Sequence, residues 1–380
     1  MRLLYFAPYS HGGLADYTHA QANALSEEGI KVTILCQPTF IDNRNGQYET
    51  LEILTESIVS PSAISRKCSY VSRILQEMGL LDHVIRKFDF HQVLLTYSEY
   101  LAPLWAWRFR KLSKEGVQFG AIVHDPVRDF KHGPNWWHRR SIKEAYSFFS
   151  HAFVHEQIKL ETGIQNKRIT TTVIPHGLYP FPPPQKSRQE MREILNIPEE
   201  TTLLLSFGHI RDGKNLDLVI KSLKDLPDCY LLVAGKEQSS GQKTAAWYQE
   251  LAIKEGVNDR CRWIVEHIPE SRVGDIFEAS DLLMLTYSSD FRSASGVLSA
   301  AANYRLPCVA SSGRGPLKTA VEKYQLGNWT EPDCAISLKK NIQLAIQDPP
   351  KPLWELYKRD NSWQKNAEVV KACLFAADHQ

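Results

Sequence analysis

Two cations and two glycines lie close together between Gly208 and Lys214, directly after an apolar run that predicts a strand. Glycine lets backbone amides approach an anion closely, and the start of a following helix adds partial positive charge. Arg211 and Lys214 supply two positive side chains, which suits a diphosphate better than a carboxylate. The segment therefore predicts a phosphate-binding loop, with Gly208 and His209 at its start.

Two known phosphate motifs come close to this loop without fitting it. The spacing of Gly208, Gly213 and Lys214 nearly matches a P-loop, but Asn215 stands where a P-loop needs Ser or Thr to reach Mg²⁺. The Gly-x-Gly-x-x-Gly fingerprint follows neither the first expected strand nor the one before Gly208, which argues against a dehydrogenase. An ordinary strand-to-helix loop with exposed charges stays open as the simpler alternative.

The elements that position this loop follow from alternating strand and helix patterns. In the first half, the expected strands are 3–7, 31–36, 92–96, 119–123, 152–154 and 172–174, with a helix over 14–28. Four prolines in the five positions 180–184 break the pattern and predict a linker. Strands are then expected at 202–207, 230–234, 262–265, 282–286 and 308–311, with a helix over 215–223. We predict an α/β protein of two Rossmann-like domains, 1–180 and 185–355, facing a central cleft, with ligands at the carboxyl ends of the strands.

The bulk composition agrees with a globular protein of two domains. A chain of 380 residues exceeds what one core normally holds. The formal charge of +2 gives no reason to expect nucleic acid as a partner. Seven dispersed cysteines without a Cys-x-x-Cys pair predict reduced thiols, and the sequence shows neither a signal segment nor a membrane-spanning stretch. We therefore expect a cytoplasmic protein.

The first loop and a later strand end supply further candidate residues. Gly12 and Gly13 would let the backbone approach a phosphate or an acceptor, with a simple tight turn as the alternative. His124 follows the expected strand 119–123 and could donate a hydrogen bond to a sugar hydroxyl, or merely cap the strand. Candidate acceptor contacts are His11, Tyr17 and Asp125.

A metal cluster near Asp125 is not expected. The spacing of Asp125, Asp129 and His132 matches no standard ligand set, so a surface charge face is the better interpretation. We therefore expect no metal and no cofactor.

Two stretches mix aromatic and basic residues. They are Trp105, Trp107, Arg108, Arg110 and Lys111, and Lys131, His132, Trp136, Trp137, His138, Arg139 and Arg140. Such a mixture can rest on a membrane that carries a lipid-linked acceptor, and aromatic rings can stack on sugars. Packing of the tryptophans beneath a solvated basic face is the simpler interpretation.

Taken in order, these segments resemble the GT-B-fold glycosyltransferases of family 4, and the resemblance covers nearly the whole chain. The matching segments are 1–36, 173–177, 207–214, 267–269 with 278–281, 295–298 with 307–311, and Ser362 with Trp363. The resemblance implies that the last segment, 356–380, crosses back to the first domain as a helix. It also implies that Ser295, Gly296, Val297 and Leu298 begin the donor-binding helix, and that His124 contacts the donor sugar.

The function implied by this resemblance is transfer of a sugar, with retention, from a nucleotide-diphosphate sugar of the UDP, GDP or ADP type. The acceptor would be a hydroxyl of a glycan or a lipid-linked molecule. The two aromatic–basic stretches add peripheral contact at the inner membrane face as an expectation. Many members carry two glutamates eight positions apart in this region, where this chain has Arg292 and Ala300. The departure keeps two alternatives open, a non-catalytic sugar-nucleotide-binding or scaffold protein and a sugar-nucleotide epimerase.

Overall fold

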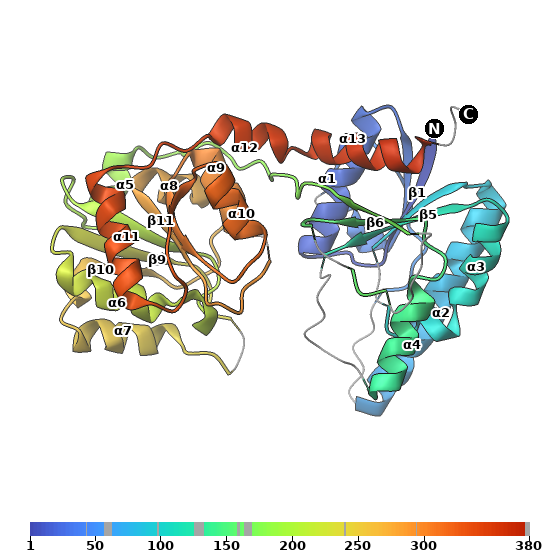
Figure 1. Cartoon of the computed structure of the whole chain (residues 1–380), viewed down its shortest axis with the longest axis horizontal. Helices are drawn as coiled ribbons and strands as arrows, with labels where there is room; N and C mark the ends of the chain where they lie inside the picture. The colour runs from blue at the N-terminus through green and yellow to red at the C-terminus, as the bar shows by residue number, and fades with distance from the viewer. Residues whose placement is uncertain are drawn as a thin grey trace. The chain divides into compact units, whose positions relative to one another are not determined.

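The computed structural model describes residues 1–42, 44–56, 63–96, 99–124, 133–157, 160–162, 169–238, 241–293 and 295–376. The chain forms two compact units, one of Met1–Gly177 with Asn361–Gln380 and one of Leu178–Asp360. Each unit is a parallel sheet with helices on both faces (Figure 1). The prediction of two Rossmann-like α/β domains is therefore confirmed.

The described part of the first unit holds a seven-stranded sheet in the order β3-β2-β1-β4-β5-β6-β7. Its strands are β1 (Arg2–Ala7), β2 (Lys31–Cys36), β3 (Glu49–Leu51), β4 (Gln92–Leu95), β5 (Gln118–Val123), β6 (His151–Val154) and β7 (Thr170–Val173). Its helices are α1 (Gly13–Glu27), α2 (Ala63–Phe88), α3 (Ala106–Lys114), α4 (Asn135–Ala145) and α13 (Trp363–Leu374). Both sheet faces are covered, so the strands between the two edges are almost continuously apolar, whereas the edge strands β3 and β7 are more polar and more exposed.

The described part of the second unit holds a six-stranded sheet in the order β10-β9-β8-β11-β12-β13. Its strands are β8 (Thr202–Phe207), β9 (Cys229–Ala234), β10 (Cys261–Ile264), β11 (Leu282–Thr286), β12 (Cys308–Ser311) and β13 (Gly327–Trp329). Its helices are α5 (Arg188–Ile194), α6 (Leu216–Ser222), α7 (Ala245–Lys254), α8 (Glu270–Ala279), α9 (Gly296–Tyr304), α10 (Pro316–Lys323), α11 (Ala335–Gln347) and α12 (Trp354–Asp360). The sequence did not predict the short edge strands β3 and β13.

The last helix, α13, returns to the first unit as predicted. Ser362 caps its start by accepting a hydrogen bond from the Lys365 amide at 3.0 Å. Ala367, Val370 and Leu374 are buried in the core above the first sheet, where α13 lies beside α1 (Figure 1). α12, in contrast, packs in the second unit.

The proline-rich segment, which was predicted to be a linker, packs on the second unit. Residues 178–184 have no regular structure, but they pack on the second unit. The Tyr304 hydroxyl donates to the Pro182 carbonyl at 2.7 Å, and the Tyr179 amide donates to Ser299 Oγ at 3.0 Å. A Cβ on Gly274 would lie 2.8 Å from Pro184 Cα. These contacts make the segment part of the second unit.

Candidate functional site

The strand order of the second unit reverses between β8 and β11, which lie side by side. In open parallel sheets, such a switch point opens a crevice at the carboxyl ends of the two strands. The Gly208–Lys214 loop follows β8, and the segment 287–295 follows β11. The predicted phosphate loop therefore lies at the position where this fold class binds ligands.

Gly208 brings the phosphate loop against the start of α9. Its φ of 86° is in the region that favours glycine. A Cβ at Gly208 would lie 3.4 Å from Lys214 Nζ and 3.5 Å from Val297 Cγ2. The structure thus brings together Gly208, Lys214 and Val297, three of the predicted donor-site residues.

Lys214 is partly buried, and its Nζ donates to the Phe207 carbonyl. Burial, followed by repulsion from Arg211, lowers the pKa of Lys214 to about 7. An ammonium with so low a pKa gains from an anionic ligand, because the ligand's negative charge offsets the cost of partial desolvation. This environment suits phosphate oxygens.

Arg211 lies over a pair of aromatic rings, Tyr287 and Phe291, that were not predicted as site residues. Its guanidinium carbon is 5.8 Å from the Tyr287 ring centre and 5.7 Å from that of Phe291. The two rings stack at 4.0 Å, and the Tyr287 hydroxyl is 3.0 Å from Ser295 Oγ. Two aromatic residues four positions apart, directly after an apolar strand, were the available signal.

Positive charge collects along this edge of the sheet. Burial lowers the pKa of His209, and the positive charges of Lys214, Arg211, Lys236 and His267 lower it further. Lys236 follows β9 and His267 follows β10, so the cationic groups continue along successive strand ends. The edge is suited to a ligand with several negative charges.

The sequence predicted that the loop leads straight into a helix, but the structure inserts a short turn between them. A 3₁₀ turn spans Asp212–Lys214, Asn215 is left-handed at φ 51°, and α6 begins at Leu216. Asn215 Nδ2 donates to Asp333 Oδ1 at 2.8 Å, while the Ser289 amide donates to Asp333 Oδ2 at 3.0 Å. Asp333 therefore ties together the loops that follow β8 and β11.

The start of α9 has the predicted helical geometry, but its four residues differ in exposure. Gly296 is exposed and Val297 is partly buried beside Gly208, whereas the Leu298 side chain is buried in the core. Leu298 can therefore offer a ligand only its backbone. At the two glutamate positions of the resemblance, Arg292 is exposed in the preceding loop and Ala300 is buried.

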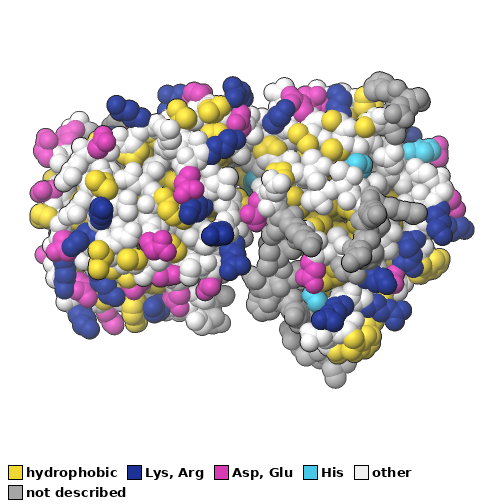
Figure 2. Space-filling model, viewed as in Figure 1, with side chains coloured by type: hydrophobic (Ala, Val, Ile, Leu, Met, Phe, Trp, Pro, Cys, Tyr) yellow, Lys and Arg dark blue, Asp and Glu magenta, His cyan; other side chains and the backbone are white. Residues whose placement is uncertain are grey.

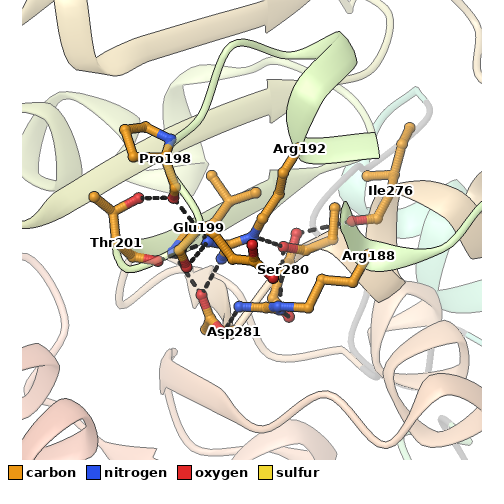
Figure 3. Close-up of polar contacts among 10 residues, drawn as sticks. Arg188, Arg192, Pro198, Glu199, Thr201, Ile276, Ser280 and Asp281 are labelled. Atoms are coloured by element: carbon orange, nitrogen blue, oxygen red, sulfur yellow. Dashed lines mark hydrogen bonds and ion pairs between the residues drawn. The ribbon is translucent and has the colours of Figure 1, made fainter. Parts of the chain in front are cut away.

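The segment 278–281 is not part of the donor site. Asp281 precedes β11, at the amino edge of the sheet, opposite the phosphate loop. Its Oδ2 accepts from Arg192 Nη2 at 2.6 Å and its Oδ1 from Arg188 Nη2 at 2.5 Å. Figure 3 shows both arginines converging on this carboxylate, while Arg192 also donates to the backbone carbonyls of Pro198, Glu199, Thr201 and Ala279. Asp281 is therefore a structural anchor.

In the first unit, the strand order reverses between β1 and β4. The loop after β1 carries His11, Gly12 and Gly13. Gly12 has a φ of 81°, and, apart from the chain neighbours, no atom of the described residues lies within 4 Å of the position that a Cβ would take at either glycine. His11 is exposed, with Nδ1 2.7 Å from Ser10 Oγ. The loop is open to a ligand on its backbone side.

Three histidines gather around one tyrosine at the carboxyl edge of the same sheet. His124 follows β5, His155 follows β6, and His176 lies after β7. Their ring centres lie 4.6, 5.3 and 5.3 Å from that of Tyr17. His124 was predicted from its place after a strand, but the sequence alone does not show that neighbouring strand ends bring all three histidines together.

Burial makes these histidines neutral. It is the largest cause that lowers the pKa of His124 to about 4 and of His155 to about 3, and His176 lowers both further. Burial also lowers the pKa of His176. Among the described residues, Nε2 of His124 and Nε2 of His155 are buried without a hydrogen-bond partner. Each offers unused hydrogen-bonding capacity at the edge of the sheet.

Tyr17 supports this histidine cluster from below and is 1% exposed. Its hydroxyl accepts from Asn366 Nδ2 at 2.9 Å, and Asn366 Oδ1 accepts from Gln21 Nε2 at 2.6 Å. Its ring also packs on Trp363 at 4.9 Å. The prediction that Tyr17 contacts an acceptor is therefore revised, because its side chain is enclosed by α13.

The remaining predicted positions fall outside what can be described. Asp125, together with Asp129 and His132, lies outside the described residues. Within the described ranges, no group of His, Cys, Asp and Glu side chains is arranged to hold a metal ion.

Two parallel α/β units, with the last helix returning to the first, define the GT-B fold. Residues 187–369, just under half of the chain, match the profile of the family described as Glycosyl transferases group 1. A search of the curated proteins found no match.

Three solved structures share the fold over almost their full length. A glycosyltransferase from Rickettsia africae is 18% identical, with a TM-score of 0.69 and 98% of each chain covered. Sucrose-phosphate synthase from Thermosynechococcus elongatus is 16% identical, with a TM-score of 0.67 and 99% of each chain covered. Anabaena HepE in complex with UDP and glucose is 14% identical, with a TM-score of 0.64 and 99% of this chain and 95% of that chain covered. At identities this low, the structural likeness establishes the fold alone. The likeness and the family profile together support an enzyme of glycosyltransferase type.

Proposed function

We propose that this protein transfers a sugar, with retention, from a nucleotide-diphosphate sugar to a hydroxyl of a glycan or lipid-linked acceptor. The observation that carries the proposal is the partly buried Lys214, which lies beside Gly208 and Val297 at the switch point of the second sheet. A departing diphosphate needs positive charge, and Lys214 with Arg211 supplies it without a metal ion. HepE, which shares the fold, has been solved with UDP and glucose, so UDP-sugars are the first donors to test.

We assign acceptor binding to the carboxyl edge of the first unit. The open loop at Gly12 and Gly13 and the unused Nε2 atoms of His124 and His155 support this assignment. A neutral imidazole can donate a hydrogen bond to a sugar hydroxyl or accept one from it. In either case it places no charge near an oxocarbenium-like centre. The described cysteines are all free thiols, which fits a reducing, cytoplasmic compartment.

The donor assignment is tested by nucleotide binding to matched lysine variants. We expect K214A to weaken UDP binding by roughly 10- to 100-fold, as for the loss of a hydrogen bond to a charged group. K254A removes an exposed lysine at the end of α7 and should leave the affinity unchanged. Equal affinities in both variants would remove the phosphate loop from the donor site.

Turnover separates the transferase from its main alternative. The positions of Arg292 and Ala300 offer no carboxylate, which favours a binding protein that does not turn over. We expect UDP-, GDP- or ADP-sugars to release nucleotide only when an acceptor is present, and NMR of the product to show the donor's anomeric configuration. Binding without release would establish a sugar-nucleotide-binding protein, and isomerised donor without acceptor would establish an epimerase.

A further inference from the structure

Two neighbouring helices of the first unit repeat one surface pattern. On α3 and on α4, an exposed tryptophan is followed by cations at the spacings that place side chains on one helical face. Trp107 is 53% exposed and Trp136 is 64% exposed. We call this set the aromatic–basic surface: Trp107, Lys111, Lys114, Trp136, Arg139, Arg140 and Lys143.

The opposite faces of the same helices hold them firmly in the fold. Phe109 and Leu112 of α3 and Ile142 and Ala145 of α4 are buried in the core below the first sheet. The two helices also contact each other. Figure 2 shows hydrophobic and basic side chains side by side over this part of the unit. The tryptophans are therefore displayed by a rigid scaffold.

Most of the positive charge on this surface is not cancelled by neighbouring carboxylates, although Lys111 lies 4.0 Å from Glu115. Arg108 and Arg110, on the same stretch of α3, pair with Asp82 and Glu144. By contrast, four cations of the surface have no carboxylate within ion-pair distance in the described ranges. They are Lys114 of α3 and Arg139, Arg140 and Lys143 of α4. The chain as a whole has a formal charge of only +2, so this is a local concentration of charge. Its partner should be anionic.

We propose that the aromatic–basic surface binds a lipid bilayer with anionic head groups. Lysine and arginine are attracted to such a surface, while tryptophan prefers the interface where its ring meets acyl chains and its N–H meets water. A purely ionic partner would use the cations but would leave the two exposed indoles unexplained. None of the helices in the described ranges has the length and apolarity needed to cross a bilayer, so the contact is peripheral.

This surface is independent of the transfer reaction. Its use to bring a lipid-linked acceptor to the enzyme, however, rests on the proposed function. Vesicle binding needs neither donor nor acceptor, so it can succeed or fail separately from a turnover assay.

The test is flotation of the full chain with phosphatidylcholine vesicles that contain phosphatidylglycerol, against phosphatidylcholine alone. A cation near an anionic bilayer contributes roughly a fivefold factor in binding, so R139Q/R140Q/K143Q should weaken it by about 100-fold. W107A/W136A should weaken binding and reduce the quenching of tryptophan fluorescence by brominated lipid. Rising salt should release the wild-type protein.

Matched variants of the second unit serve as controls. K254Q/K340Q/K351Q removes the same formal charge from exposed positions, and W247A removes a partly exposed tryptophan beside Lys243. Both should bind vesicles like the wild type. The proposal is overturned by absence of binding at low salt, by equal losses in the control variants, or by tight binding to soluble polyglutamate that the tryptophan variants leave unchanged. All substituted side chains are exposed, so unaltered melting temperatures are expected.

Discussion

Replacing Asn366 by alanine removes three hydrogen bonds from the interior of the first unit. Asn366 is 0% exposed, and its Nδ2 donates to the Tyr17 hydroxyl at 2.9 Å and to the Pro175 carbonyl at 2.7 Å. Its Oδ1 accepts from Gln21 Nε2 at 2.6 Å. Each bond contributes about 1 kcal/mol net, and a buried group left unpaired costs about 1–3 kcal/mol. We therefore expect the variant to lose roughly 3 kcal/mol or more of unfolding free energy.

The assay is urea unfolding of the full chain combined with hydrogen exchange at the amides of α13. Gln364 is an exposed amide on the same helix, so Q364A is the matched control. We expect N366A to speed exchange throughout α13 and to shift the imidazole resonances of His124 and His155, because the Tyr17 ring loses its anchor. Agreement of N366A with Q364A to within about 0.5 kcal/mol would refute this account of the network.

Four further outcomes follow from the structure. Lys214, with a pKa of about 7, must be charged to hold a diphosphate, so nucleotide affinity measured by calorimetry should be highest below pH 7 and fall by up to about tenfold per pH unit above it. The buried histidines have pKa values below their usual 6.5, so the unfolded chain binds more protons; the urea midpoint should fall as pH drops from about 6.5 toward 4. R192A removes a buried guanidinium that bonds Asp281 and four backbone carbonyls, so it should lower the urea midpoint by the equivalent of about 3 kcal/mol, against less than about 1 kcal/mol for alanine at the more exposed Arg188. G177A would place a Cβ 2.0 Å from the Trp363 ring, so a loss of about 1–3 kcal/mol is expected in thermal unfolding.

Most of the fold was available from the sequence because the strands are buried on both faces. Continuous apolar runs such as 31–36 and 282–286 match β2 and β11 closely. β3 and β13 were missed because they are three-residue edge strands with only partly buried side chains, so no apolar run marks them. Here pairing with a neighbouring strand, which is a tertiary effect, decides the structure.

The candidate site divides in the same way. The loop 208–214 could be singled out from the sequence because its glycines and cations are neighbours in sequence. The grouping of Tyr17, His155 and His176 was not, since it depends on which strands lie side by side. Asn366 carries no local signal at all: an asparagine within a helix is ordinary, and only the return of α13 to the first unit gives it three partners.

That return has a consequence for the order in which the chain folds during synthesis. Leu178–Asp360 is continuous, so the second unit has its whole sequence before residues 361–376 leave the ribosome. The first unit, although translated earlier, waits for α13 to cover Tyr17 and Leu94 and to supply Asn366. Until then, apolar side chains that α13 later covers stay exposed, and we expect chaperones to bind the nascent first unit there. A helix that is synthesised after the second unit thus completes the unit that was started before it.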